Sequence, residues 1–161
     1  KVGHELLEDI VRYIPDTKEN KKVFERLALN SNCMVREYIA DKENISKKTI
    51  KILLADKRHG VIVFLLKNQK VANRLTPKQI KTIIALGNPI HCKVIASNLD
   101  VLTKCDICKL AKFLSNHNDP TIRLELVNRW NRDIPKKIIK KLTKDKDIDV
   151  FILNAATAQY F

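Results

Sequence analysis

One stretch decides the fold, and it reads TPKQIKTIIALGNPIHCKVIASN over residues 76–98. Thr76 suits the N-cap of a helix, and Pro77 suits the first helical position, where a missing N–H costs nothing. Gln79 lies three residues after the cap and completes a capping box. Gly87 can end the helix because glycine takes a positive φ easily. The stretch therefore opens with one short, well-delimited helix.

A second helix follows at once, because Asn88-Pro89 repeats the starting signal and Asn98 marks an end. Apolar residues fall at helical spacing in both helices, at Ile80, Ile83, Ile84, Ile90, Val94 and Ile95. Two short amphipathic helices joined by a tight turn cannot bury their apolar faces alone, so the hairpin predicts similar neighbours.

The rest of the chain repeats this hairpin at intervals of about 26 to 32 residues. The pattern predicts an all-α fold, an α-solenoid of about five helical-hairpin repeats in one domain. We place the repeats at 17–45, 46–75, 76–102, 103–133 and 134–161, after an N-terminal helix over 1–15. The start at Lys1 without Met and the apolar end at Tyr160-Phe161 lead us to expect a fragment of a longer repeat protein.

Further boundaries follow from capping residues and proline. We predict helix starts at Asp16 with Glu19 as a weaker capping box, at Ser46, at Thr103, at Asp119-Pro120 and at Pro135. The first helix of the fourth repeat, over about 104–115, is predicted to be one turn longer than the others, and 69–75 to be a loop. The β-branched run Val61–Leu66 suits a strand as well as a helix, and its place in the repeat favours a helix.

Composition limits the function classes. The 161 residues contain no apolar run of about 18 residues, so we expect no membrane span. The net charge of +13 suits a polyanionic partner, although a lysine-rich genome composition explains it equally well. Cys92 fits a core position, and Cys105 and Cys108 form a CxxC without a second pair. We therefore expect no metal site and no cofactor, and thiols suited to the cytoplasm.

Several residues resemble a known repeat family. They are Leu27-Ala28, Val35-Arg36 and Ala40-Asp41 in the first copy, Thr76-Pro77, Ala96 and Asn98 in the third, and Leu110-Ala111, Ile122-Arg123 and Asn128 in the fourth. Over about residues 17–158 this pattern resembles the leucine-rich repeat variant (LRV), an α-helical relative of the HEAT repeats. The resemblance implies a right-handed α-solenoid that acts as an interaction scaffold. The arginine becomes Val63, Lys93 and Phe151 in the other copies, and the cysteine-rich segment of some iron–sulfur members is absent.

Two surfaces are candidates for binding. The second helix of each pair usually lines the concave face of a solenoid, and its candidates are Arg36, Tyr38, Lys93, Arg123, Arg129 and Trp130. A basic ladder near the first-helix starts comprises Lys21, Lys48, Lys78, Lys104 and Lys136. Alternatively, Arg36 and Arg123 pair with acids of adjacent copies, such as Glu37 or Glu125, Trp130 packs between repeats, and the ladder is a solvated edge.

Three functions fit these features. The first is a non-catalytic scaffold that binds a protein partner through the concave face. The second is sequence-tolerant binding of a nucleic-acid backbone by the basic face. The third is a HEAT-like DNA-base glycosylase, which rests on fold analogy alone, because we find no catalytic constellation. The oligomeric state and the identity of the partner do not follow from these patterns.

Overall fold

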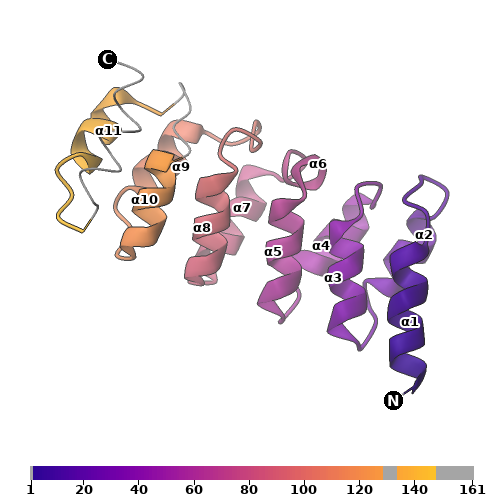
Figure 1. Cartoon of the computed structure of the whole chain (residues 1–161). Helices are drawn as coiled ribbons and strands as arrows, with labels where there is room; N and C mark the ends of the chain where they lie inside the picture. The colour runs from indigo at the N-terminus through magenta and orange to yellow at the C-terminus, as the bar shows by residue number, and fades with distance from the viewer. Residues whose placement is uncertain (1, 129–133, 148–161) are drawn as a thin grey trace. The chain divides into compact units, whose positions relative to one another are not determined.

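The structure is a computed structural model that describes the backbone of residues 2–128 and 134–147. Every regular element in this part of the chain is a helix, which confirms the predicted all-α class (Figure 1). The chain divides into two compact units, Lys1–Arg74 and Leu75–Phe161, which are described separately below. Within the described ranges no helix is both long and apolar enough to cross a membrane.

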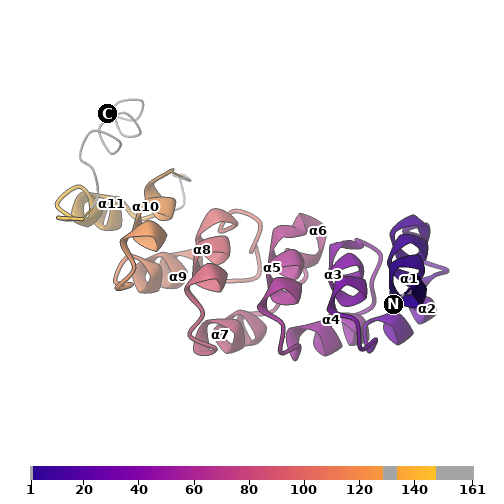
Figure 2. The same cartoon turned by 60° about the horizontal axis from the view of Figure 1, so that its bottom comes forward.

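The first unit is built from helical hairpins in two rows. Its helices are α1 (Val2–Tyr13), α2 (Lys21–Leu27), α3 (Cys33–Asp41), α4 (Lys47–Leu54), α5 (His59–Lys67) and α6 (Gln69–Ala72). Helix α3 packs between α1 and α5 in one row, and α2 contacts α4 in the other (Figures 1 and 2). The core lies between the rows and contains Val11, Phe24, Val35, Ile39, Ile50, Leu53, Ile62 and Leu65.

The second unit repeats the arrangement. Its described helices are α7 (Pro77–Ala85), α8 (Pro89–Ser97), α9 (Ile107–Leu114), α10 (Pro120–Asn128) and α11 (Lys136–Leu142). Helix α8 packs along α10, and α10 also contacts α9 and α11. The core contains Ile80, Ile83, Cys92, Ile95, Ala111, Leu114, Ile122, Leu126, Ile139 and Leu142, so the prediction that Cys92 is a small core residue is confirmed.

The hairpin over 76–98 forms as its residues predict. The Thr76 side chain accepts a hydrogen bond from the Gln79 backbone N–H, and the Gln79 side chain accepts one from the Thr76 N–H. Gly87 takes a φ of +68°, which side chains with a Cβ rarely adopt, immediately after the first helix. The Asn88 side chain then caps α8 by accepting from the Ile90 N–H.

The run Val61–Leu66 is helical, as its place in the repeat predicts, and it belongs to α5. Its β-branched residues do not prevent this, because α5 buries much of its surface against neighbouring helices. The close approach of α5 to α3 depends on Gly60, because a Cβ added there would lie 2.3 Å from Oε1 of Glu37 on α3. Glycine therefore lets α5 pack tightly on α3 at this point.

Two predicted features of the fourth repeat are wrong. Helix α9 begins at Ile107, and its N-cap is Asp106, whose side chain accepts from the Lys109 N–H, so Thr103 is not the cap. The helix has 8 residues, the same length as α4, and so lacks the predicted extra turn. The spacing predicts helix over residues 104–106 because Lys104 matches the basic residues at the other first-helix starts, but these residues precede α9.

Other boundaries also differ from the prediction. Asp16 does not cap α2, because its carboxylate accepts hydrogen bonds from the Glu43 and Asn44 N–H groups at 2.6 and 2.9 Å. Helix α2 begins at Lys21 after Asn20, which makes no side-chain cap. The predicted loop over 69–75 contains the short helix α6, capped by Asn68. The predicted fifth repeat, 134–161, lies outside the described residues from residue 148 onward.

Candidate functional site

Arg36 on α3 is a structural residue in the first unit. Its Nε and Nη2 donate to Oδ2 and Oδ1 of Asp56 at 2.5 and 3.0 Å. Its Nη1 donates to the backbone oxygens of Asn30 and Ser31 at 2.7 and 3.0 Å. The guanidinium thus joins the loop before its own helix to the loop between α4 and α5, and its donors already have protein acceptors.

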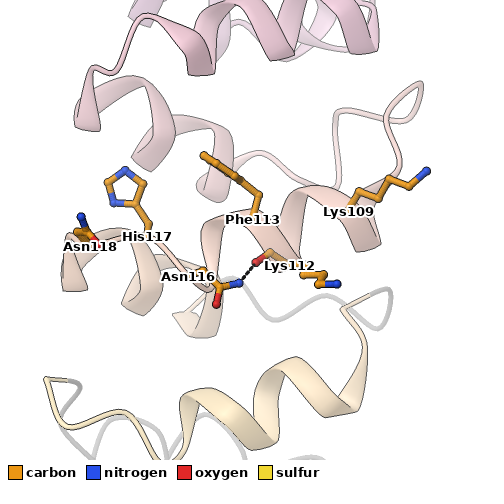
Figure 3. Close-up of a pocket in the computed structure, with 6 residues that line it drawn as sticks. All are labelled: Lys109, Lys112, Phe113, Asn116, His117 and Asn118. Atoms are coloured by element: carbon orange, nitrogen blue, oxygen red, sulfur yellow. Dashed lines mark hydrogen bonds between the residues drawn. The ribbon is translucent and has the colours of Figure 1, made fainter.

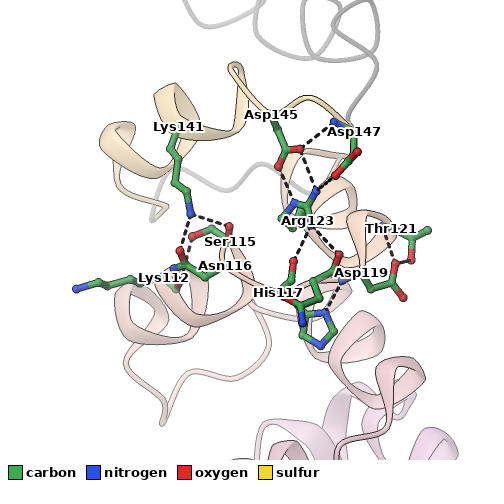
Figure 4. A network of polar contacts seen from close by, with 11 residues as sticks. Lys112, Ser115, Asn116, His117, Asp119, Thr121, Arg123, Lys141, Asp145 and Asp147 are labelled. Atoms are coloured by element: carbon green, nitrogen blue, oxygen red, sulfur yellow. Dashed lines mark hydrogen bonds and ion pairs between the residues drawn. The ribbon is translucent and has the colours of Figure 1, made fainter.

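Arg123 on α10 makes the same bonds in the second unit (Figure 4). It donates to both carboxylate oxygens of Asp145 at 2.6 and 2.9 Å, and to the backbone oxygens of His117 and Asn118 at 2.7 and 3.0 Å. A further bond reaches Asp147 at 2.8 Å. The acids belong to the following repeat, as the pairing alternative expects, but they are not Glu37 or Glu125.

These pairs shift the carboxylates toward the ionised form. Burial alone would raise the pKa of Asp56, but hydrogen bonds from the Arg36 side chain and the Arg58 backbone N–H outweigh burial and lower that pKa below its ordinary value. Hydrogen bonds from Arg123 likewise lower the pKa of Asp145, against a smaller opposing effect of burial. Both arginines are therefore held by fully charged partners near neutral pH.

We expect the folded state to lose stability in acid through these carboxylates. A carboxylate with a lowered pKa binds fewer protons folded than unfolded, so its contribution is complete above the unfolded pKa of about 4 and is lost as the pH falls through the folded value. Urea denaturation at constant ionic strength should give a falling midpoint below about pH 4. Asp56→Asn should weaken that decline, and an unchanged decline would contradict the assignment.

The other residues predicted for the concave face differ in burial and in contacts, and two of them are not described. Tyr38 is half-buried under the Arg12 guanidinium, which lies 5.1 Å from the ring centroid and donates to the phenol oxygen. Lys93 is exposed on α8. Arg129 and Trp130 lie outside the described residues.

The predicted basic ladder is regular only in part. Lys21 and Lys136 are the first residues of α2 and α11, and Lys48 and Lys78 are the second residues of α4 and α7. Lys104 instead lies in the loop three residues before α9. Lys48 pairs with Glu25 at 3.2 Å, so this ladder member already has a counter-charge.

A groove of about 660 Å³ runs between α9 and α11 in the second unit. Its lining residues are Cys108, Lys112, Ser115 and Asn116 on the α9 side and Pro135, Lys137, Ile138, Lys140, Lys141 and Lys144 on the α11 side. Five of these ten residues are lysines, whereas Ile138, Pro135 and Cys108 supply apolar surface. We call this site the lysine groove.

One lysine holds the groove together and four are available to a ligand. Lys141 Nζ donates to the Ser115 backbone oxygen at 2.9 Å and to Asn116 Oδ1 at 2.6 Å, linking α11 to α9 (Figure 4). The other four are exposed, and in the described part of the chain their ammonium groups pair with no acid; they are Lys112, Lys137, Lys140 and Lys144. Like charges one turn apart on a helix repel, so an anionic ligand would relieve an unfavourable arrangement.

A second cavity of about 510 Å³ lies on another side of α9. Its lining comprises Lys109, Lys112, Phe113, Asn116, His117 and Asn118 (Figure 3). Phe113 is 46% exposed, and Figure 3 shows its ring and the His117 ring pointing to the same side of the helix. Lys109 pairs with Asp106 at 3.1 Å, which leaves this cavity less basic than the lysine groove.

The sequence contains a signal for the groove that the predicted ladder misses. The run KKIIKKLTK over 136–144 places Lys137, Lys140, Lys141 and Lys144 on one side of a helix at spacings of three and four. Their missing counter-charges become evident only when the contacts are known. Comparisons with protein-family models, with curated proteins and with solved structures find no match for this chain.

Proposed function

We propose that the chain is a non-catalytic α-helical repeat scaffold, an α-solenoid of the LRV or HEAT type, that binds a protein partner. Recurring hairpins support this class, as do the equivalent bonds of Arg36 and Arg123, each of which links one repeat to the next. Such arrays offer long exposed surfaces, and binding a partner is their usual role.

The partner contributes an acidic, amphipathic segment to the lysine groove. The single observation that carries this proposal is the set of four groove lysines that pair with no acid in the described ranges, around an apolar floor of Ile138, Pro135 and Cys108. Opposite charge at the rim would steer and orient a ligand, and apolar contact at the floor would hold it. We place the binding site in this groove and not on the predicted concave face, because the N–H groups of Arg36 and Arg123 already donate to acceptors within the chain.

The chemistry of the groove favours a protein segment over nucleic acid. Among the described residues, its lining contains neither an aromatic ring for base stacking nor an arginine for bidentate phosphate contacts. Its apolar floor at Ile138 would face a phosphodiester backbone without benefit, whereas a leucine of an amphipathic segment would cover it.

The test is binding of a blocked helical peptide of about 14 residues, rich in leucine and glutamate, measured by fluorescence anisotropy. We expect saturable binding that weakens at least tenfold in the Lys137→Ala/Lys140→Ala/Lys144→Ala variant, a loss of about 1.4 kcal/mol or more. A charge-matched control replaces three exposed lysines of the first unit, Lys18, Lys22 and Lys57. Equal loss in both triple variants would show attraction to net charge alone and contradict the groove.

A second function, nucleic-acid binding, is favoured by one observation, the exposed Phe113 that lines one cavity with Lys109 and Lys112 (Figure 3). An exposed ring next to lysines can stack on a base while the lysines neutralise phosphates. Under this alternative, single-stranded DNA binds with a steep salt dependence, and Phe113→Ala weakens binding at every salt concentration. Absence of binding at about 50 mM salt would exclude it.

A further inference from the structure

The two units contain equivalent helix pairs, α2 with α4 and α9 with α11. The buried Phe24 of α2 and its C-cap Ala28 match the buried Ala111 of α9 and its C-cap Ser115 in spacing. The buried residues of the partner helices match in the same way, Ile50 with Ile139 and Leu53 with Leu142. This register allows the side chains between the helices to be compared one by one.

In the first unit a carboxylate joins the two helices. Glu25 Oε1 accepts from Ser46 Oγ at 2.7 Å, and Glu25 Oε2 lies 3.2 Å from Lys48 Nζ. The next residue of this cluster, Thr49, is fully buried and its hydroxyl lies 3.0 Å from that of Ser46. One acid, one lysine and two hydroxyl groups thus form the polar contact between α2 and α4.

In the second unit a lysine is kept at the position of Lys48, but the position of Glu25 is no longer acidic. The buried-residue register places Lys112 where Glu25 lies, Pro135 where Ser46 lies, and Lys137 where Lys48 lies. Ile138 takes the place of the buried Thr49 but is only half-buried. Two lysines therefore line the part of the groove that corresponds to the acid–lysine pair of the first unit, and the apolar Ile138 beside them is partly uncovered.

We propose that the partner's acidic segment places one carboxylate between Lys112 and Lys137, in the role that Glu25 has within the first unit, and covers Ile138 with an apolar side chain. This inference rests on the proposed function and specifies its contact. A carboxylate there completes an interaction that the chain makes internally at the equivalent place. The ligand is accordingly an acidic segment with a glutamate or aspartate about one helical turn from a leucine or similar residue.

The decisive variant is Lys112→Glu, which builds the carboxylate of the first unit into the second. In this variant the new acid pairs with Lys137 and takes the place of the ligand's carboxylate. We expect the leucine–glutamate peptide to bind at least tenfold more weakly, while the free chain keeps its helical circular dichroism and resists urea at least as well as the parent. The matched control is Lys81→Glu, an equal charge change at an exposed lysine of α7 outside the groove lining.

A second measurement identifies the paired groups. Peptides in which one glutamate at a time is replaced by glutamine are titrated against the parent chain and against Lys112→Ala. We expect one of the replacements to weaken binding to the parent severalfold and to have no effect on the variant, because both changes remove the same contact.

The outcomes separate the two proposals. If the peptide binds the parent chain but Lys112→Glu weakens binding no more than Lys81→Glu, the carboxylate position is wrong and the lysine groove keeps its role. If the peptide does not bind the parent chain, the proposed function fails and this inference fails with it. A tenfold loss confined to Lys112→Glu, with one glutamate coupled to Lys112, establishes the contact.

Discussion

The Arg36→Ala variant should lose about 3 kcal/mol of unfolding free energy, measured by urea denaturation near pH 7. The substitution removes bonds to Asp56 and to the backbone oxygens of Asn30 and Ser31, and those to Asp56 and Asn30 are partly shielded from water. It also leaves the Asp56 carboxylate, only 7% exposed, without its counter-charge. A charge left unpaired in that setting costs more than the loss of an exposed ion pair, which is worth at most about 1 kcal/mol.

Three controls show whether the geometry of the arginine matters. Arg36→Lys keeps the charge but cannot form the fork to Asp56, so it should lose most of the same stability. Arg26→Ala removes an exposed arginine of α2 and should change stability by less than about 0.5 kcal/mol. The double variant Arg36→Ala/Asp56→Ala should be more stable than the sum of the single losses implies. If Arg36→Ala behaves like Arg26→Ala, the pair does not stabilise the unit.

Local chemistry made much of the fold predictable from sequence. The boundaries at Thr76, Gly87 and Asn88 depend on hydrogen bonds and φ values within a few residues, and those are properties of the residues themselves. Ser46 caps α4 for the same reason, through the Thr49 N–H at 3.0 Å. Helices with strong local signals at their starts were therefore placed well.

Errors arose where distant contacts compete with local signals. Asp16 resembles a capping residue, but its carboxylate instead accepts hydrogen bonds from the backbone N–H groups of residues 43 and 44. Thr103 and Asp106 both suit an N-cap, and Asp106 additionally pairs with Lys109, which favours the later start. Sequence spacing alone cannot rank such alternatives, because their energies differ by about 1 kcal/mol or less.

The candidate site was less predictable than the fold. The sequence allows Arg36 and Arg123 either to offer charge to a partner or to pair internally. Their acidic partners, Asp56 and Asp145, lie 20 and 22 residues further along the chain. The lysine groove depends on which lysines lack an acid, a property of tertiary contacts hidden in a chain with 31 basic residues. Replacement of Glu25 by Lys112 becomes visible only with the helix register, which the predicted start of α9 misplaced.

Leu65→Ala in α5 should destabilise the first unit by about 3 kcal/mol, whereas Phe64→Ala, next to it, should cost less than about 1 kcal/mol. Leu65 is fully buried, and its truncation leaves a cavity among packed neighbours, whereas Phe64 is 39% exposed. The comparison uses adjacent residues of one helix, so differences in helix propensity contribute little.

This pair of variants also tests the helical state of the run Val61–Leu66 directly. In a helix the buried residues are Val61, Ile62, Leu65 and Leu66, as the structure has them. A half-buried strand buries alternate residues, so it could bury Leu65 with Val63 or Leu66 with Phe64, but not Leu65 and Leu66 together. Urea denaturation of Leu66→Ala beside Leu65→Ala and Phe64→Ala therefore distinguishes the two structures, because only the helix makes both leucine truncations costly and Phe64→Ala mild. A larger loss for Phe64→Ala would contradict the packing of α5 between its neighbours, and with it the hairpin on which the repeat reading of the first unit depends.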